Sequence, residues 1–117
     1  MKVILVNGSP HKEGCTYTAL KEVEKELIAA GVETELIWLG TQPVSGCLGC
    51  NGCCRRGPDG EKPTARCVIN DVVNEFLDKA EQADGFIFGS PVHYAALSGT
   101  LTSFMDRVFY GKGKIFR

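Results

Sequence analysis

Residues 2–10 read Lys2-Val3-Ile4-Leu5-Val6-Asn7-Gly8-Ser9-Pro10. The apolar run predicts a strand that is buried on both faces, as in a parallel sheet. The turn at its end leads into a helix predicted over residues 16–30, which Gly31 terminates. A buried strand that passes directly into a helix is the first unit of an alternating α/β fold.

The same alternation continues along the chain. Strands are predicted over residues 33–39 and 86–88, the latter short and buried, and helices from Asp71, a plausible N-cap, and over residues 99–110. The side chains expected to face the sheet are Leu20, Val23, Leu27, Val72, Val73, Phe76, Leu77, Ala80, Leu101, Phe104, Met105, Val108 and Phe109. This order predicts a doubly wound parallel sheet between two helical layers.

The length and net charge of the chain exclude several classes of function. The 117 residues fit one domain, and a net charge of −1 gives no field that would favour nucleic acid or an anionic membrane. No apolar run approaches the roughly 18 residues of a membrane span, and the start does not have the form of a signal peptide. We therefore expect a cytoplasmic protein that binds neither membrane nor nucleic acid.

The loop after the first strand has the composition of an anion site. Backbone N–H groups at a helix N-terminus attract a phosphate, and hydroxyl groups add donors. The residues predicted to contact it are Ser9, Lys12, Cys15, Thr16, Tyr17 and Thr18. The patterns for dinucleotides and nucleoside triphosphates are absent, which favours a single phosphate. The alternative is a plain strand-to-helix turn with a threonine cap.

A second loop, residues 90–99, also follows a predicted strand. Both loops should lie at the carboxyl edge of the sheet, where ligands of such folds bind. Small residues, backbone amides and an aromatic ring suit a flat heteroaromatic ligand. The predicted contacts are Pro91, Val92, His93, Tyr94 and Ser98. Alternatively, Tyr94 is a partly buried core residue and His93 an ordinary surface histidine.

These segments carry a family resemblance. They are residues 7–16, Gly46-Cys47-Leu48-Gly49-Cys50-Asn51-Gly52-Cys53, Cys67-Val68-Ile69-Asn70-Asp71, Ser90-Pro91-Val92-His93-Tyr94 and Ser98-Gly99. The sequence resembles the flavodoxin-like NADPH-dependent FMN reductases, and most of all their iron-sulfur flavoprotein branch. The resemblance implies FMN as cofactor, a reduced nicotinamide or ferredoxin-like electron donor, and a homo-oligomer. It also implies a five-stranded sheet, of which residues 1–117 would form the N-terminal portion with three strands.

A cysteine-rich loop spans residues 43–67. Cys47, Cys50 and Cys53 stand at two-residue gaps, as in ferredoxins, and Cys67 is the candidate fourth ligand of a [4Fe–4S] cluster. Cys54 is a spare candidate, and we expect either Cys53 or Cys54 to serve, not both. Four thiolates also suit a tetrahedral zinc ion. Free or regulatory thiols are the third possibility.

The expected activity is that of an FMN-binding, NAD(P)H-dependent oxidoreductase of the FMN- or quinone-reductase type, or of an iron-sulfur flavoprotein. The chemistry belongs to the cofactor, so no catalytic side chain is predicted. A flavodoxin-type electron carrier or redox-sensing module without a nicotinamide site is the alternative. The spacing Cys50-x5-Arg56 also matches small phosphotyrosine phosphatases, but it follows the second strand, away from the anion-binding helix end.

Overall fold

The computed structural model describes residues 1–54 and 65–113. Its strands and helices, in chain order, are β1 (Lys2–Asn7), α1 (Cys15–Ala29), β2 (Glu33–Trp38), a 3₁₀ turn η1 (Gly52–Cys54), α2 (Val72–Ala80), β3 (Gly85–Gly89), β4 (Val92–His93), β5 (Ala96–Leu97) and α3 (Gly99–Gly113).

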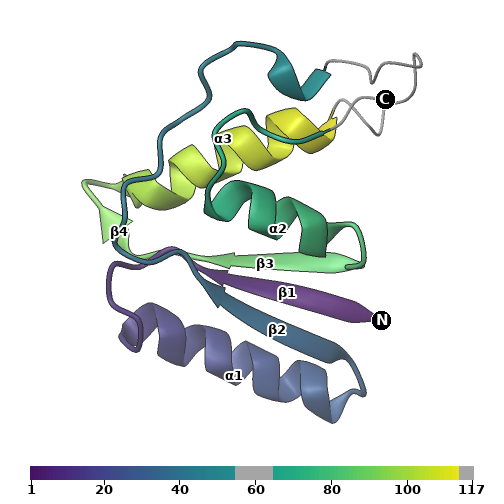
Figure 1. Ribbon diagram of the computed structural model, residues 1–117. Coiled ribbons are helices and arrows are strands. Elements are labelled where there is room, and N and C mark those ends of the chain that lie inside the picture. Colours follow the sequence, from purple (N-terminus) through teal and green to yellow (C-terminus); the bar gives the residue numbers. More distant parts are fainter. Residues whose placement is uncertain (55–64, 114–117) are drawn as a thin grey trace.

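The sheet of β1, β2 and β3 is parallel, with β1 in the centre and the order β2-β1-β3. In Figure 1, α1 covers one face of this sheet, and α2 and α3 cover the other. The predicted three-layer, doubly wound α/β class is confirmed. All three strands point toward the same edge, so the loops that follow them begin close together.

The central strand β1 is buried on both faces, as its apolar run predicts. Val3 and Leu5 pack with Leu20 of α1. Ile4 and Val6 alternate with them and join the larger core under α2 and α3. This larger core also contains Leu39, Val73, Phe76, Leu77, Leu101, Phe104 and Val108.

The ends of two helices confirm their predicted signals. Asp71 accepts a hydrogen bond from the Val73 N–H at 3.1 Å and thereby caps α2. Gly31 follows α1 with φ = +82°, a left-handed conformation that glycine adopts without steric cost.

Three side chains expected to be buried are not. Val23 and Phe109 are 39% and 50% exposed, although they were expected to face the sheet. Phe86, predicted on a buried strand, is 39% exposed because β3 lies at the edge of the described sheet. Periodicity places a residue on a face of an element, but the neighbouring layers decide how far that face is covered.

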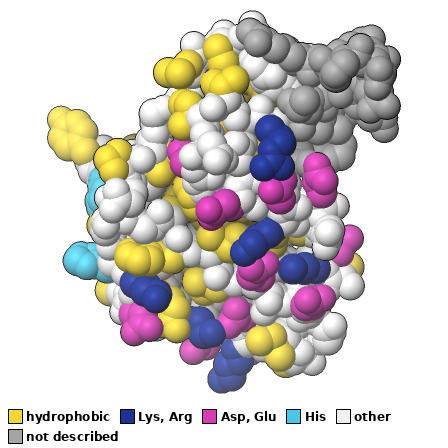
Figure 2. Space-filling view, in the orientation of Figure 1, with side chains coloured by type: hydrophobic (Ala, Val, Ile, Leu, Met, Phe, Trp, Pro, Cys, Tyr) yellow, Lys and Arg dark blue, Asp and Glu magenta, His cyan; other side chains and the backbone are white. Residues whose placement is uncertain are grey.

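The cysteine segment leaves the carboxyl end of β2 and runs across the α2/α3 layer to η1 (Figure 1). Apart from η1, its described part has no regular structure up to α2, in agreement with the predicted irregular loop. Figure 2 shows basic and acidic side chains interspersed over one face of the molecule, in keeping with the small net charge of −1.

Candidate functional site

The first loop is held from inside by Asn7, the last residue of β1. Its side chain is fully buried, accepts a hydrogen bond from the Ser9 N–H at 2.9 Å and donates one to the Lys12 carbonyl at 3.1 Å. Ser9 is also buried, and its hydroxyl oxygen accepts the His11 N–H at 3.1 Å. The loop is therefore ordered by its own hydrogen bonds.

A neighbouring strand supports the same loop. The indole N–H of Trp38, at the end of β2, donates to the Ser9 carbonyl at 2.9 Å. The Lys12 ammonium lies over the Trp38 ring, 5.9 Å from its centroid. Lys12 is exposed, so its positive charge is accessible to a ligand from solvent.

The helix that follows begins without a side-chain cap. Gly14 is the N-cap of α1, and the first turn has no acidic residue. Cys15 is the first helical residue and is exposed, while Thr16 and Tyr17 are half-buried. Thr18 turns its hydroxyl back to the Gly14 carbonyl at 3.1 Å. The N–H groups of the first turn are thus available to an anion from outside the chain.

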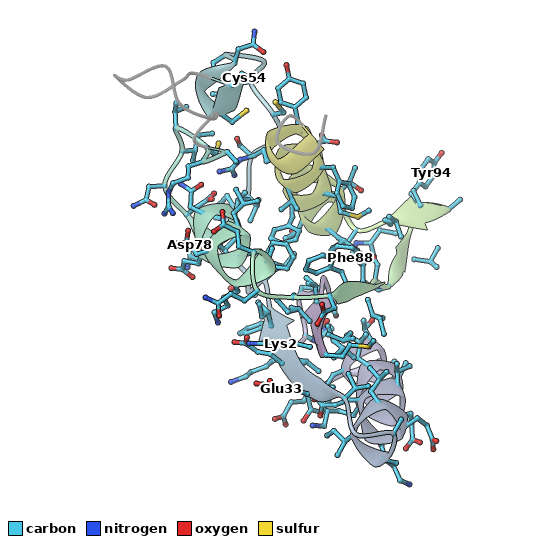
Figure 3. All side chains as sticks on the ribbon, turned by 90° about the vertical axis from the view of Figure 1, so that its right-hand side faces the viewer. Lys2, Glu33, Cys54, Asp78, Phe88 and Tyr94 are labelled. Atoms are coloured by element: carbon cyan, nitrogen blue, oxygen red, sulfur yellow. The ribbon has the colours of Figure 1, made fainter. Side chains whose placement is uncertain are left out.

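The second loop forms a β-hairpin of β4 and β5, which the sequence did not predict. Tyr94 and Ala95 occupy its turn with φ = +48° and +60°. Val92, His93 and Tyr94 are exposed, and Figure 3 shows Tyr94 at the tip of the hairpin, directed away from the body of the protein. The possibility that Tyr94 is a core residue is excluded by its complete exposure.

Ser98 joins the two loops. Its hydroxyl donates to the Gly8 carbonyl at 2.7 Å, and its oxygen accepts the Leu101 N–H at 3.2 Å. The Gly8 N–H also donates to the Gly89 carbonyl at 2.9 Å. Ser98 is buried and Pro91 is half-buried, so both lie at the base of the hairpin. The two predicted loops meet at one edge of the sheet.

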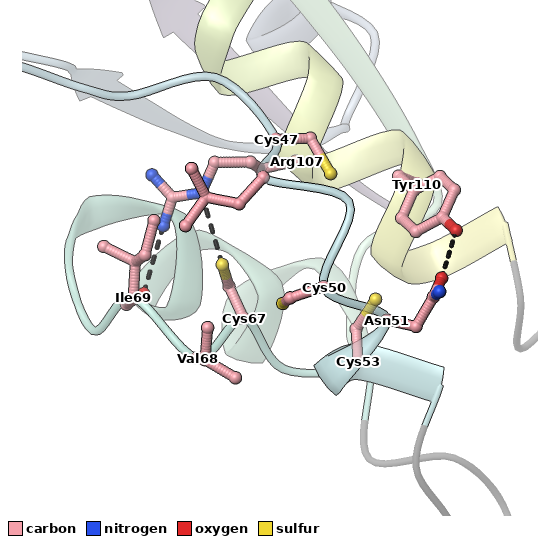
Figure 4. A pocket seen from close by; sticks show the side chains of 10 residues that line it. Cys47, Cys50, Asn51, Cys53, Cys67, Val68, Ile69, Arg107 and Tyr110 are labelled. Atoms are coloured by element: carbon pink, nitrogen blue, oxygen red, sulfur yellow. Dashed lines mark hydrogen bonds between the residues drawn. The ribbon is translucent and has the colours of Figure 1, made fainter.

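The four predicted cysteine ligands line one cavity. Cys47, Cys50, Cys53 and Cys67 all line the same small pocket, which opens to solvent (Figure 4). Arg107 and Tyr110 of α3 contribute to its wall. The four thiols come from two segments on either side of residues 55–64, and the fold places both segments along the same pocket.

Within the described residues, no three cysteine, histidine, aspartate or glutamate side chains lie close enough to hold one metal ion. A tetrahedral zinc ion has Zn–S bonds of about 2.3 Å, which places its sulfur atoms only about 3.8 Å apart. The cysteine sulfur atoms of Cys53 and Cys54 are at 3.8 Å, but they are adjacent in sequence. Burial, followed by the contact with Cys54, raises the pKa of the Cys53 thiol to about 11.

Arg107 connects this cavity to α3. Its guanidinium donates to the Cys67 sulfur at 3.3 Å and to both carboxylate oxygens of Asp71 at 2.7 Å. These hydrogen bonds to Asp71 raise the pKa of Arg107 above its usual value. The Tyr110 hydroxyl donates to the Asn51 side-chain oxygen, so α3 contacts the cysteine segment at two points (Figure 4).

The two candidate sites occupy different parts of α3. Ser98, just before the helix, binds the first loop, whereas Arg107 binds the cysteine segment. At about 1.5 Å of rise per residue, roughly 14 Å of helix axis separates these residues. Cys54, at the top of Figure 3, and Tyr94, at its right-hand side, are accordingly well separated.

Sequence reasoning missed several residues that shape these sites. Asn7, Trp38 and Arg107 were not singled out, because each acts through a partner distant in the chain or through a carbonyl group. The signal that could have found Arg107 is a charged residue among the apolar positions of a predicted buried helix face. Arg56, the second residue of the phosphatase pattern, lies outside the described residues.

Comparison with known proteins adds a family. The profile of the family described as NADPH-dependent FMN reductase matches residues 1–117. An iron-sulfur flavoprotein of Methanocaldococcus jannaschii is 40% identical over 107 residues, which cover 92% of this chain and 51% of the relative. An iron-sulfur flavoprotein of Methanosarcina thermophila is 33% identical, over 92% of this chain and 52% of the relative. One of Archaeoglobus fulgidus is 31% identical, over 95% of this chain and 47% of the relative. The chain thus spans about half the length of these curated relatives.

None of the helices in the described part of the chain has the length and hydrophobicity needed to cross a membrane.

Proposed function

The chain belongs to the NADPH-dependent FMN reductase family. We therefore propose that it is the FMN-binding part of a flavoprotein oxidoreductase. The observation that carries the proposal is the meeting of two ordered loops at the carboxyl edge of the sheet, joined by the bond from Ser98 to Gly8. An uncapped helix N-terminus opens at the same edge.

The first loop is proposed to bind the phosphate of FMN. The N–H groups of Cys15, Thr16 and Tyr17 carry the partial positive charge of the helix N-terminus, and Lys12 adds a full charge. Thr18 contributes less through its hydroxyl, since it already donates to the Gly14 carbonyl, whereas the Ser9 hydroxyl accepts the His11 N–H and keeps its own hydrogen to donate. Asn7 and Trp38 keep the loop in the conformation that exposes these donors.

The second loop is proposed to bind the flavin ring and its ribityl chain. The exposed hairpin residues Val92, His93 and Tyr94 offer backbone groups and an aromatic ring, while Pro91 and Ser98 fix its base. FMN, when bound, supplies the hydride- and electron-transfer chemistry. The residues of this chain bind and orient it, and none is required as an acid or base.

The cysteine cavity is proposed to hold a [4Fe–4S] cluster. Its four thiols line one solvent-open space, but they do not converge at the short distances that one metal ion requires. A four-iron cluster attaches each thiolate to a different iron, so its ligands lie farther apart. Cys47, Cys50, Cys53 and Cys67 would be these ligands. The spacing of Cys47, Cys50 and Cys53 and the iron-sulfur flavoprotein relatives support the cluster over a zinc ion.

The electron donor is proposed to be a reduced nicotinamide, in line with the family. The alternative is a carrier or redox-sensing module that binds the same FMN and accepts electrons from a ferredoxin-like protein. Rapid anaerobic mixing with NADPH separates these functions. Loss of the oxidised-flavin absorbance supports the reductase, and an unchanged spectrum identifies the carrier.

Flavin binding itself can be tested through Trp38, the only tryptophan of the chain. Because its indole contacts the first loop, FMN bound there should quench tryptophan fluorescence. Titration with riboflavin, which lacks the phosphate, is the matched control and should bind much more weakly. Equal affinity for FMN and riboflavin would contradict a phosphate site in this loop.

The cluster is tested by anaerobic reconstitution with iron and sulfide, followed by metal analysis and visible spectroscopy. Replacement of Cys47, Cys50 or Cys67 by alanine should lower iron content substantially, because each removes one ligand. Cys54→Ala is the control and should retain the cluster. If Cys54→Ala loses iron and Cys53→Ala retains it, the third ligand is Cys54. Retention of zinc in place of iron and sulfide would contradict the cluster.

A further inference from the structure

Arg107 is a buried cation with every donor satisfied. Its side chain is only 1% exposed, although arginine is usually found at the surface. The Nε–H donates to the Cys67 sulfur at 3.3 Å. The Nη1 and Nη2 groups each donate to one oxygen of Asp71, and also to the carbonyls of Ser45 at 3.3 Å and Ile69 at 3.0 Å. A planar guanidinium, unlike an ammonium, presents its donors in this fixed fork.

These contacts connect both arms of the cysteine segment to one helix. Ser45 precedes Cys47, whereas Cys67, Ile69 and Asp71 come after residues 55–64, which lie outside the described residues. Asp71 also caps α2, so the position of the guanidinium is tied to two helices. Cys67, which is remote in sequence from the other three cysteines, therefore reaches the cavity wall beside a rigid donor (Figure 4).

We propose that Arg107 is a positioning residue for the sulfur ligand Cys67 and raises the reduction potential of the cluster that this cavity binds. The inference rests on the proposed cluster. Reduction adds negative charge to the iron and sulfur atoms, and an N–H group directed at a ligand sulfur stabilises that charge. Asp71 offsets part of the positive charge of Arg107 and holds the Nε–H toward Cys67.

Two substitutions are expected to shift the potential in opposite directions. Arg107→Lys keeps a positive charge but loses the planar fork, so the bond to Cys67 is lost and the potential becomes more negative. Asp71→Asn keeps one oxygen that can accept from Arg107 and cap α2, but it removes the negative charge paired with Arg107. Its potential should become more positive than that of the unmodified protein.

Arg66→Lys is the matched control. Arg66 is adjacent to Cys67 in sequence, but its guanidinium is exposed and forms an ion pair with Asp78 on the surface. The same chemical change at this position should leave the potential unaltered. A general effect of exchanging arginine for lysine near the cluster would appear in both variants.

The measurement is a redox titration of the reconstituted protein followed by electron paramagnetic resonance, together with iron and FMN content. A negative shift in Arg107→Lys with full iron supports the inference. Full iron with an unshifted potential overturns it. If Arg107→Lys loses its iron, the reduction potential of Asp71→Asn is the deciding measurement. A positive shift there supports the inference, and an unshifted potential overturns it. Failure of the unmodified protein to assemble any cluster contradicts the proposed function itself and is thereby distinguished from these outcomes.

Discussion

At the scale of single residues, Asn7 determines the shape of the proposed phosphate loop. Its amide is fully buried, and its two ends bind a backbone donor and a backbone acceptor of the same loop. No residue other than asparagine offers both an acceptor and a donor at this length of side chain. The loop conformation therefore depends on a side chain that is not exposed to bind a ligand.

We expect Asn7→Ala to weaken FMN binding on the order of tenfold. It leaves the buried Ser9 N–H without its acceptor, which costs about 1–3 kcal/mol, and the loop relaxes away from the conformation that exposes its donors. The measurement is FMN titration by Trp38 fluorescence. Gln82→Ala, at an exposed amide, is the control. An unchanged FMN affinity in Asn7→Ala would show that this conformation does not matter for binding.

At the scale of elements, α3 packs closely against the end of β1. A side chain added at Gly8 would bring its Cβ within 2.7 Å of the Leu101 Cβ and 3.2 Å of the Gly89 carbonyl oxygen. The same end of β1 bonds to Gly89 and Ser98. The close approach of helix and strand is thus part of what aligns the two loops.

We predict that Gly8→Ala destabilises the protein by about 1–3 kcal/mol, since a backbone oxygen and a Cβ cannot move aside easily. Gly99→Ala, at the first position of α3, is the control because its added Cβ would meet nothing within 4 Å. It should be neutral or stabilise by less than about 1 kcal/mol. Urea unfolding of both variants measures the difference, and equal midpoints would refute the predicted clash.

At the scale of the molecule, the edge of the described sheet at β3 has no neighbouring strand among the described residues. Beside the edge strand β3 lies an apolar groove, open to solvent, whose lining includes Phe76, Phe86, Phe88 and Phe109. Exposed apolar area of this kind promotes association. That residues 1–117 form three strands of a five-stranded sheet stays a prediction.

We expect the 117-residue chain to self-associate through this face. Phe109→Lys places a charge beside the groove, where Phe109 packs edge-on against Phe88, and should shift the chain toward monomer. Tyr94→Lys is the control, because it also replaces an aromatic side chain by lysine, but at the fully exposed hairpin tip. Light scattering after size-exclusion chromatography measures the mass. A monomeric unmodified chain would contradict the expectation.

The sequence by itself determined the class of fold, because buried parallel strands and amphipathic helices have periods that can be recognised locally. It also identified both loops and the cysteine pattern, whose residues are close together in the chain. It did not predict the hairpin of β4 and β5, whose strands are too short to show a period.

Only the tertiary structure decided which distant groups meet. Trp38 of β2 reaches Ser9 just beyond the neighbouring strand β1, Ser98 joins the two loops, and Arg107 brings Cys67 to the wall of the cysteine cavity. These contacts depend on how the layers pack against one another, and local propensity carries no information about such pairings. The candidate residues thus follow from the sequence, and their arrangement into two separate sites follows from the packing of α3 against the sheet.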